Sequence, residues 1–252
     1  GAKVKHDYVK ARGIRTSYVE AGSGRILLLL HGAGLGSVVW YQIIKELSKH
    51  YRVICPDKPG YGESENPVAS YDRSFYLEWL RDFTQALSLE EFDLVGNSQG
   101  GAVGIAYALA YPEQVRRLVL SNTAGISDRW SIWARSAIVG FHLLPTALTG
   151  WNLGRYTAYM RDSIDQPWLE YSLQVVKEKG GKNPILIGMG RATSPFSEKQ
   201  LRSLRVPTLI IWGREEKLFP VWHAELAHDL IPNSRLEVLD KAGHLPFLDQ
   251  PK

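Results

Sequence analysis

The chain has 252 residues, of which 44% are hydrophobic and 22% are charged, as in an ordinary globular protein of one domain or of one domain with an insertion. Its net charge of +4 comes from scattered Lys and Arg residues rather than from a basic stripe, so we predict no nucleic-acid partner. The single cysteine, Cys55, excludes an intrachain disulfide and a cysteine-based metal site, and no apolar run approaches the roughly 20 residues of a membrane span.

The elements predicted along the chain alternate between strands and helices. Residues 6–22 predict a hairpin with a turn near Arg12-Gly13. Further strands are predicted at 26–30, 52–57, 92–96, 116–122, 207–213 and 235–240, and helices at 40–49, 74–87, 100–111 and 221–231. Several of these strands are continuously apolar, which is typical of a parallel sheet that helices cover on both faces.

Residues 124–205 break this alternation, because their apolar positions follow a helical period and four of the eight tryptophans lie there. We expect a core domain of residues 1–123 and 206–252 and a helical cap of residues 124–205. The aromatic residues of such a cap either form its own small core or line a substrate pocket. The expected pocket residues are Trp133, Phe141, Trp151 and Leu245.

The stretch "DLVGNSQGG" places Ser98 between a short apolar strand and a helix, with Gly96 and Gly100 on either side. Serine and glycine are also ordinary turn residues, so the motif alone is compatible with a simple turn. A strand that enters such a corner and a helix that leaves it favour a nucleophile elbow. The helix N-terminus behind Ser98 would then supply free N–H groups and positive partial charge where an oxyanion forms.

A nucleophilic serine needs a base and a carboxylate that orients the base. His244 lies in the loop "KAGHLPFLDQP", directly after the last predicted strand, and is the favoured base. The segment "WGREEKLFP" offers both Glu215 and Glu216 as the acid, and local chemistry does not separate them. Of the remaining histidines after Ser98, His223 and His228 are expected to be surface or packing residues, and His142 is expected to belong to the cap.

Five short segments form one pattern along the chain: "HGAGLG" at 31–36, "DKPGYGES" at 57–64, "GNSQGG" at 96–101, "WGREEKLFP" at 212–220 and "AGHLPFLDQP" at 242–251. Together they resemble the α/β-hydrolase superfamily, in the group with a helical cap. The resemblance implies an α/β fold with a mostly parallel eight-stranded sheet flanked by helices and a cap after strand six. It also implies a serine hydrolase without metal or cofactor, acting on a small-molecule ester.

The same resemblance assigns roles to individual residues. The backbone N–H groups of Ala33 and Gln99 would form the oxyanion hole. The family pattern G-x-x-D-x-x-x-P places the acid at Glu216, where this chain has glutamate instead of aspartate. A carboxylate after the sixth strand serves some relatives, and the nearest here is Asp128. Because Ser98 is the nucleophile, relatives that use aspartate there, such as haloalkane dehalogenases and epoxide hydrolases, are excluded as close analogues.

Part of the pattern is similar to enzymes that hydrolyse carbon–carbon bonds in ring-fission products. Asn97 before the nucleophile and the spacing of Trp40 after "HGAGLG" match those enzymes. Leu35 stands where they have proline, and Leu245 stands where they have tryptophan. The two departures favour hydrolysis of a small to medium apolar carboxylic ester through an acyl-enzyme on Ser98.

Two alternatives stay open at this point. The first is a C–C hydrolase of a ring-fission dienoate, for which a cap arginine would bind the substrate's acid group, and the candidates are Arg155, Arg161 and Arg191. The second is a non-catalytic ligand-binding member of the fold. The expected location is cytoplasmic, with an upstream targeting segment as the alternative, because the sequence starts at Gly1 without a methionine.

Overall fold

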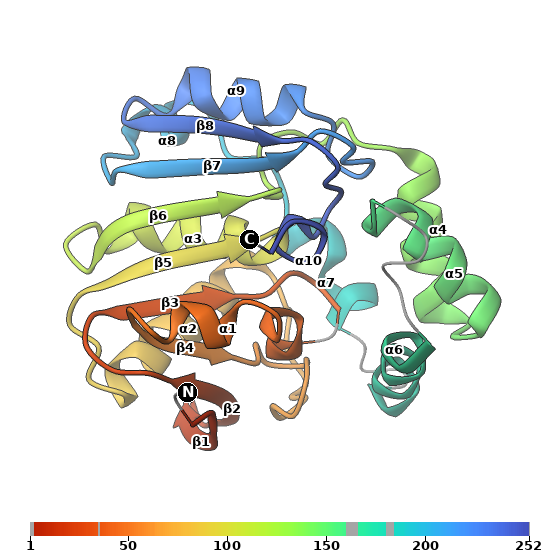
Figure 1. The fold of residues 1–252 in the computed structure, drawn as a ribbon, viewed down its shortest axis with the longest axis horizontal. Coiled ribbons are helices and arrows are strands. Elements are labelled where there is room, and N and C mark those ends of the chain that lie inside the picture. The colour runs from red at the N-terminus through yellow and green to blue at the C-terminus, as the bar shows by residue number, and fades with distance from the viewer. Residues whose placement is uncertain (1–2, 35, 160–165, 180–183, 252) are drawn as a thin grey trace.

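The computed structural model describes residues 3–34, 36–159, 166–179 and 184–251, and an eight-stranded sheet runs through its centre (Figure 1). The spatial order of the strands is β1-β2-β4-β3-β5-β6-β7-β8. β1 pairs with β2, and β2 with β4, in antiparallel fashion, whereas the remaining neighbours are parallel. The bounds are β1 Lys5–Ala11, β2 Ile14–Ala21, β3 Ile26–Leu30, β4 Arg52–Pro56, β5 Phe92–Asn97, β6 Val115–Ser121, β7 Thr208–Gly213 and β8 Ser234–Leu239.

The predicted fold class is confirmed, and so is the first hairpin. β1 and β2 are joined by Arg12 and Gly13, which both have positive φ, 53° and 76°. Two such residues in a two-residue loop give the turn whose twist matches that of the flanking strands. This hairpin forms the antiparallel edge of the sheet and leaves the parallel strands to build its centre.

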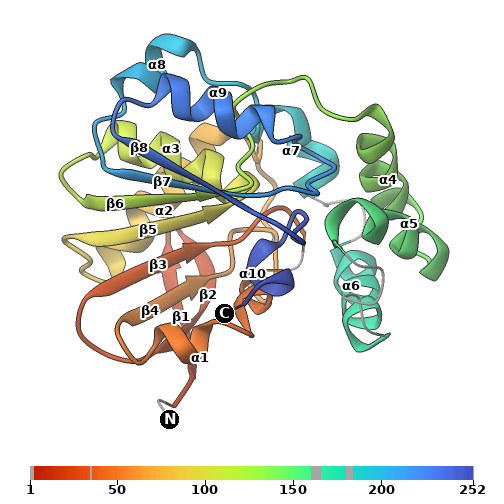
Figure 2. The ribbon, with the colours of Figure 1, turned by 45° about the horizontal axis from the view of Figure 1, so that its top comes forward.

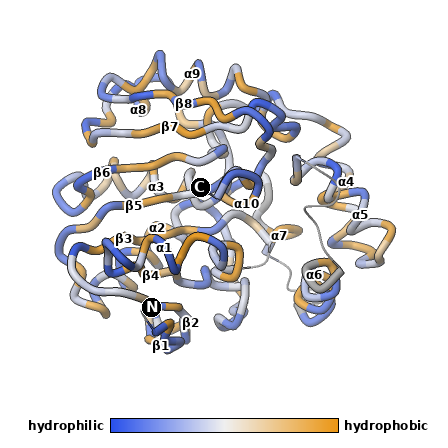
Figure 3. The backbone as a smooth tube through the Cα atoms, viewed as in Figure 1, coloured by the Kyte–Doolittle hydropathy of each residue, from blue (hydrophilic) through white to orange (hydrophobic). Residues whose placement is uncertain are grey.

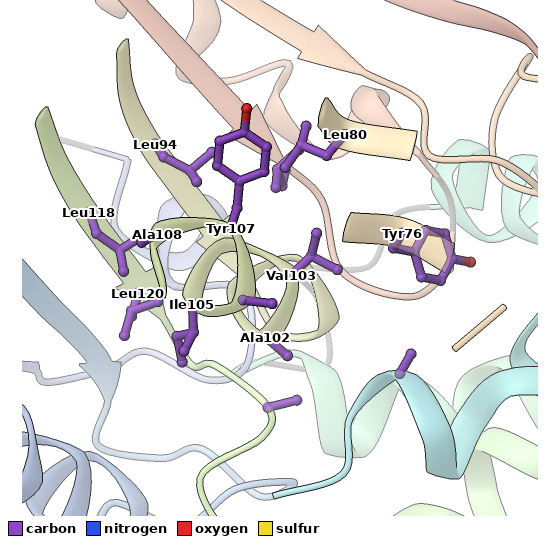
Figure 4. Close-up of a cluster of buried hydrophobic side chains, with 14 of the residues drawn as sticks. Tyr76, Leu80, Leu94, Ala102, Val103, Ile105, Tyr107, Ala108, Leu118 and Leu120 are labelled. Carbon is purple, nitrogen blue, oxygen red and sulfur yellow. The ribbon is translucent and has the colours of Figure 1, made fainter. Parts of the chain in front are cut away.

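The apolar strands divide their side chains between two cores. In β3, Leu28 and Leu30 belong to a large core, while Leu27 and Leu29 belong to a smaller one on the opposite face. Successive strand residues point to opposite faces, so a strand covered on both sides must be apolar at every position. Figure 4 shows part of the large core, where Tyr107 and its neighbours on α3 pack against strand residues such as Leu94.

Helices cover both faces of the sheet, as Figure 2 shows from a second direction. The large core is closed by α2, α3, α8 and α9, and the smaller core by η1, α1 and α10. The bounds of these elements are η1 Ser37–Trp40, α1 Ile44–Leu47, α2 Arg73–Ala86, α3 Gln99–Ala110, α8 Glu198–Ser203, α9 Trp222–Leu230 and α10 Pro246–Asp249.

The chain between β6 and β7 contributes the outer helices. They are α4 Ile132–Leu143, α5 Ala147–Thr157, α6 Gln166–Lys179 and α7 Pro184–Ala192, and α4 to α6 lie beyond the carboxyl ends of the parallel strands (Figures 1 and 2). α8 follows in the same segment but packs on the sheet side, because Leu201 and Leu204 belong to the large core. Loops at the carboxyl ends of the strands therefore face the outer helices.

No helix among the described residues combines the length and the apolar composition that crossing a membrane requires.

Candidate active site

Ser98 occupies the corner between β5 and α3, as the sequence predicts. Its backbone has φ 52° and ψ −119°, which is strained for a residue with a side chain and common at functional corners. A Cβ atom on Gly96 would lie 2.5 Å from the carbonyl oxygen of Gly100, and one on Gly100 would lie 2.2 Å from that of Leu30. Only glycine at both positions lets α3 cross the strands closely enough to form this corner.

His244 follows β8 and is paired with the carboxylate of Glu216. The His244 Nδ1 atom lies 2.5 Å from Glu216 Oε2, and the two side chains are almost fully buried. Since a carboxylate only accepts hydrogen bonds, Nδ1–H is the donor and Nε2 is the basic nitrogen of the ring. The arrangement gives a base whose tautomer is fixed by a buried acid.

The loop that carries Glu216 also binds the second oxygen of its carboxylate. Glu216 Oε1 accepts a 2.6 Å hydrogen bond from the backbone N–H of Leu218, two residues ahead, so both carboxylate oxygens have partners. Glu215 points elsewhere, and its Oε2 accepts a hydrogen bond from the N–H of Ala242. Asp128 is exposed. Of the three acids that the sequence suggested, the structure brings Glu216 to His244.

The remaining histidines have other surroundings. Burial lowers the pKa of His142 and of His223, which keeps both rings neutral near pH 7. His142 Nδ1 donates to the carbonyl oxygen of Ile138 one helical turn earlier. His228 is exposed on α9. His142 lies on α4, in the expected cap, and lines the cavity beside Ser98.

Ala33 and Gln99, the residues expected to form the oxyanion hole, line the same cavity as Ser98 and His244. Gln99 is the first residue of α3, and the first N–H groups of a helix have no partner within it. The loop before Ala33 lies against the serine, because a Cβ atom on Gly32 would be 3.1 Å from Ser98 Cβ. Ala33, Gln99 and Ser98 thus line one cavity.

A fully buried lysine lies behind this loop. Lys58 Nζ donates to the carbonyl oxygens of His31 and Gly32, the latter at 2.9 Å. His31 Nδ1 donates to the same Gly32 oxygen at 2.6 Å, while His31 Nε2 accepts from the backbone N–H of Lys58 at 3.0 Å. Burial lowers the pKa of both side chains well below their ordinary values. The peptide group that carries the Ala33 N–H therefore receives two hydrogen bonds on its carbonyl side.

Two asparagines hold the loop that carries the base. Asn97 Nδ2 donates to the carbonyl oxygen of His244 at 3.1 Å. Asn122 Nδ2 donates to that of Gly243 at 2.7 Å, and Asn122 Oδ1 accepts from the N–H of Gly213 at 3.0 Å. Sequence reasoning used Asn97 only for a resemblance and gave Asn122 no role. A polar residue at the carboxyl end of β6, next to the loops that carry Glu216 and His244, is the signal that could have found it.

Ser98 and His244 open into a largely apolar cavity of about 170 Å³. This volume is far above the roughly 10–15 Å³ that a single water requires, so the cavity has room for an organic group. None of its lining residues in the described part of the chain is a Lys, Arg, Asp or Glu. The cap contributes mainly apolar or small residues, among them Ile138, Phe141, Gly150, Leu153, Leu169 and Val176.

The expected pocket residues divide into two groups. Phe141 and Leu245 line the cavity, whereas Trp133 and Trp151 do not, and the prediction for these two is wrong. Trp133 is 73% exposed on the outer side of α4. The side of α5 that faces the cavity carries residues 150, 153, 154 and 157, which follow the helical period, and position 151 falls off this face.

The cap arginines considered for an acidic substrate do not reach the cavity where they are described. Arg155 and Arg191 are exposed and are absent from the cavity lining. Arg161 lies outside the described residues. Within the described ranges there is also no group of three or more His, Cys, Asp or Glu side chains that could hold a metal ion.

Comparisons with known proteins agree with this architecture. The family model described as alpha/beta hydrolase fold matches residues 25–251. A 2-hydroxymuconate semialdehyde hydrolase from Pseudomonas sp. strain CF600 is 32% identical over 244 residues, covering 93% of this chain and 85% of that protein. A pimeloyl-[acyl-carrier protein] methyl ester esterase from Aeromonas hydrophila is 30% identical over 243 residues, covering 92% of each.

A solved structure of a meta-cleavage product hydrolase from Pseudomonas fluorescens IP01 matches with a TM-score of 0.90 and 28% identity, covering 97% of this chain and 93% of that one. Proteins at similar identity thus include a semialdehyde hydrolase and a methyl ester esterase. Identity alone does not choose between such substrates, so the choice has to come from the cavity.

Proposed function

The chain belongs to the alpha/beta hydrolase fold family, and within it we propose a serine hydrolase that cleaves a small to medium apolar carboxylic ester through an acyl-enzyme on Ser98. The observation that carries this proposal is the composition of the cavity beside Ser98 and His244. Its described lining is mostly apolar and contains no Lys, Arg, Asp or Glu. Such a lining favours an uncharged, apolar acyl or alcohol group.

In the proposed reaction, Ser98 Oγ attacks the ester carbonyl carbon while His244 Nε2 accepts its proton. The negative charge that develops on the carbonyl oxygen is stabilised by the N–H groups of Ala33 and Gln99. Glu216 stabilises the imidazolium that forms, through its hydrogen bond to His244 Nδ1. The imidazolium then donates its proton to the leaving alcohol. In the second half of the reaction, water attacks the acyl carbon while His244 accepts its proton, and the proton then passes to Ser98 Oγ as the carboxylic acid leaves.

The same cavity disfavours the alternative of a ring-fission dienoate. Such a substrate carries a carboxylate, and a buried charge is normally paired with a group of opposite charge. The described lining offers neutral hydroxyl and amide groups, such as Thr157, Ser172 and Asn97, but no ammonium or guanidinium group.

The test compares p-nitrophenyl esters of increasing acyl length with a ring-fission dienoate on the same enzyme. We expect ester turnover to exceed dienoate turnover at every acyl length that fits. Faster dienoate cleavage would reject the ester assignment and favour the C–C hydrolase. Turnover of neither substrate, without labelling by a fluorophosphonate, would reject an enzyme of this type.

The role of Ser98 is tested by substitution and by mapping the label. Ser98→Ala should lower kcat by about 10⁴- to 10⁶-fold, the loss typical of removing a triad nucleophile. Ser203→Ala is the matched control, because Ser203 is exposed on α8 and does not line the cavity. A fluorophosphonate adduct on Ser172, which lines the same cavity, would contradict the assignment of Ser98.

A further inference from the structure

The outer helix α4 is apolar on both of its faces. Among its residues, Ile132–Leu143, only Arg135 carries a full charge. Its inner face lines the cavity through Ile138 and Phe141. A helix at the surface of a protein normally exposes polar side chains on its outer face, and a helix that is apolar all round is normally covered. The outer face of α4 is therefore a surface that lacks a cover among the described residues.

The exposed apolar side chains concentrate on this part of the molecule. Five of the twelve exposed large hydrophobic side chains in the described ranges lie between residues 132 and 148. Their exposed fractions range from 63% for Leu144 to 79% for Leu148. Single exposed apolar residues need no explanation, but a cluster of them marks an interaction surface. We name this cluster the outer apolar face: Ile132, Trp133, Leu143, Leu144 and Leu148.

The members of the outer apolar face share one side of the cap. Ile132 and Leu143 are eleven residues apart, as are Trp133 and Leu144, so the two pairs mark two adjacent stripes along α4. Leu144 and Leu148 continue these stripes through the turn into α5, which packs against α4. Figure 3 shows hydrophobic residues on these helices, at the edge of the molecule away from the sheet.

The segment that carries the outer apolar face is rich in positive charge. Between Asp128 and Asp162 the sequence contains four arginines and no acidic residue. Of these arginines, Arg129, Arg135 and Arg155 lie in the described ranges. Arg135 is exposed at the border of the outer face of α4 and stacks over the ring of Trp130 at 4.4 Å. Asp128 is an exposed acidic neighbour of this segment, and its backbone oxygen accepts a hydrogen bond from Arg135. Apolar side chains bordered mainly by cations are the combination by which peripheral proteins bind anionic bilayers.

We infer that the outer apolar face docks on the surface of an anionic lipid bilayer. Trp133 and the leucines would enter the boundary between headgroups and acyl chains, while the arginines remain at the phosphates. The protein would lie on the membrane rather than cross it. Docking does not depend on the proposed ester hydrolysis, and its test measures binding rather than turnover.

A second copy of the chain fits the same face less well. In a symmetric dimer, identical patches meet each other, so the arginines around one patch would approach those around the other. No acidic residue between positions 129 and 161 is available to pair with them. Like charges brought together in this way oppose association, whereas anionic headgroups neutralise them.

The experiment measures co-sedimentation of the full chain with vesicles of phosphatidylcholine, with and without phosphatidylglycerol. We expect binding to the anionic vesicles that weakens as salt is added, since the arginine contribution is screened. Trp133→Ser together with Leu144→Ser should lower the partition coefficient at least about tenfold, because two large apolar side chains leave the lipid. Arg135→Gln should lower it about fivefold on anionic vesicles and leave it unchanged on neutral ones.

Val68→Ser is the matched control, because Val68 is 89% exposed in the loop before α2 and lies outside the outer apolar face. It should bind like the wild type. If the double variant fails to fold, Arg135→Gln and the salt dependence of the wild type decide the question. The inference is wrong if the wild type does not bind anionic vesicles. It is also wrong if the double variant and Val68→Ser bind them with equal partition coefficients. A concentration-dependent dimer that the double variant abolishes would instead assign this face to a second copy.

Discussion

Asn122 is expected to fix the position of the loop that carries Glu216 relative to the loop that carries His244. Its side chain is fully buried and joins Gly213, which ends β7 three residues before Glu216, to Gly243, which precedes His244. Asn122→Gly removes both hydrogen bonds without strain, because the backbone there has φ 40° and glycine adopts such angles freely. This substitution therefore isolates the contribution of the amide group.

The structure gives the expected size of the effect. The Gly213 N–H and the Gly243 carbonyl would both lose their side-chain partner, and a buried orphan group costs about 1–3 kcal/mol. The free energy of unfolding should fall by about 2–5 kcal/mol, or a Tm decrease of roughly 4–20 °C for a domain of this size. Asn122→Ala should be less stable than Asn122→Gly by about 1–2 kcal/mol, because alanine is strained at positive φ.

Activity supplies the readout that a purely structural role would not change. A catalytic group displaced by about 1 Å can lose on the order of 100-fold in rate, so we expect kcat to fall by about 10- to 100-fold with KM nearly unchanged. The assays are urea denaturation and steady-state turnover of the best p-nitrophenyl ester. A stability loss below about 1 kcal/mol would refute the hydrogen-bond argument. An unchanged kcat in a destabilised variant would refute the positioning role.

Three further predictions concern the site and the corner that supports it. Glu216→Gln should lower kcat by about 10⁴-fold. Glu215→Gln keeps an oxygen that accepts from the Ala242 N–H, so its kcat should stay within about tenfold of the wild-type value. Equal losses in the two variants would contradict the assignment of Glu216 as the acid. Lys58→Met should change the pH dependence of stability. The unfolded chain binds a proton on Lys58 that the native state binds less well, so wild-type stability should rise relative to the variant as pH increases towards about 10.4, and a pH-independent difference in urea denaturation would count against this. Gly100→Ala should abolish activity and lower the free energy of unfolding by about 3 kcal/mol or more, since the added Cβ would lie 2.2 Å from a backbone oxygen. Gly140→Ala in α4 is the control and should be neutral or stabilising, because nothing lies within 4 Å of its added Cβ. A similar change in Tm in both variants would refute the steric argument.

Local signals predicted most of the sheet. The strand predicted at 26–30 is β3. A continuously apolar run of this length is typical of a strand that is covered on both faces of the sheet, so the local pattern was sufficient. The helix predicted at 40–49 is replaced by η1 and the four-residue α1. Trp40 and Ile44 are buried in the smaller core there, and so short a helix gains little from its own hydrogen bonds. Tertiary packing therefore decides the path of this segment.

The cavity lining was less accessible to sequence reasoning because α4 and α5 give no clear periodic signal. α4 is apolar on both faces, so its pattern does not say whether Trp133 or Phe141 faces inward. On α5 the inward positions include Gly150, Gly154 and Thr157. A cavity is the space that side chains leave free, so small residues mark it better than the large aromatic residues on which the prediction relied.

The polar residues that support the site depend on contacts between distant segments. The segment "DKPGYGES", which contains Lys58, has the composition of an exposed turn. Its sequence gives no reason to expect a buried lysine, because charged side chains are rarely buried without partners. The partners of Lys58 are the carbonyl oxygens of His31 and Gly32, 27 and 26 residues earlier, together with the ring face of Tyr61 at 5.1 Å. Every residue has a backbone carbonyl group, so the sequence does not show which carbonyl groups will bind the lysine. Lys58 is buried because it binds the backbone of residues 31–32, which follow β3, and this contact can be inferred only once β3 and β4 are placed side by side in the sheet.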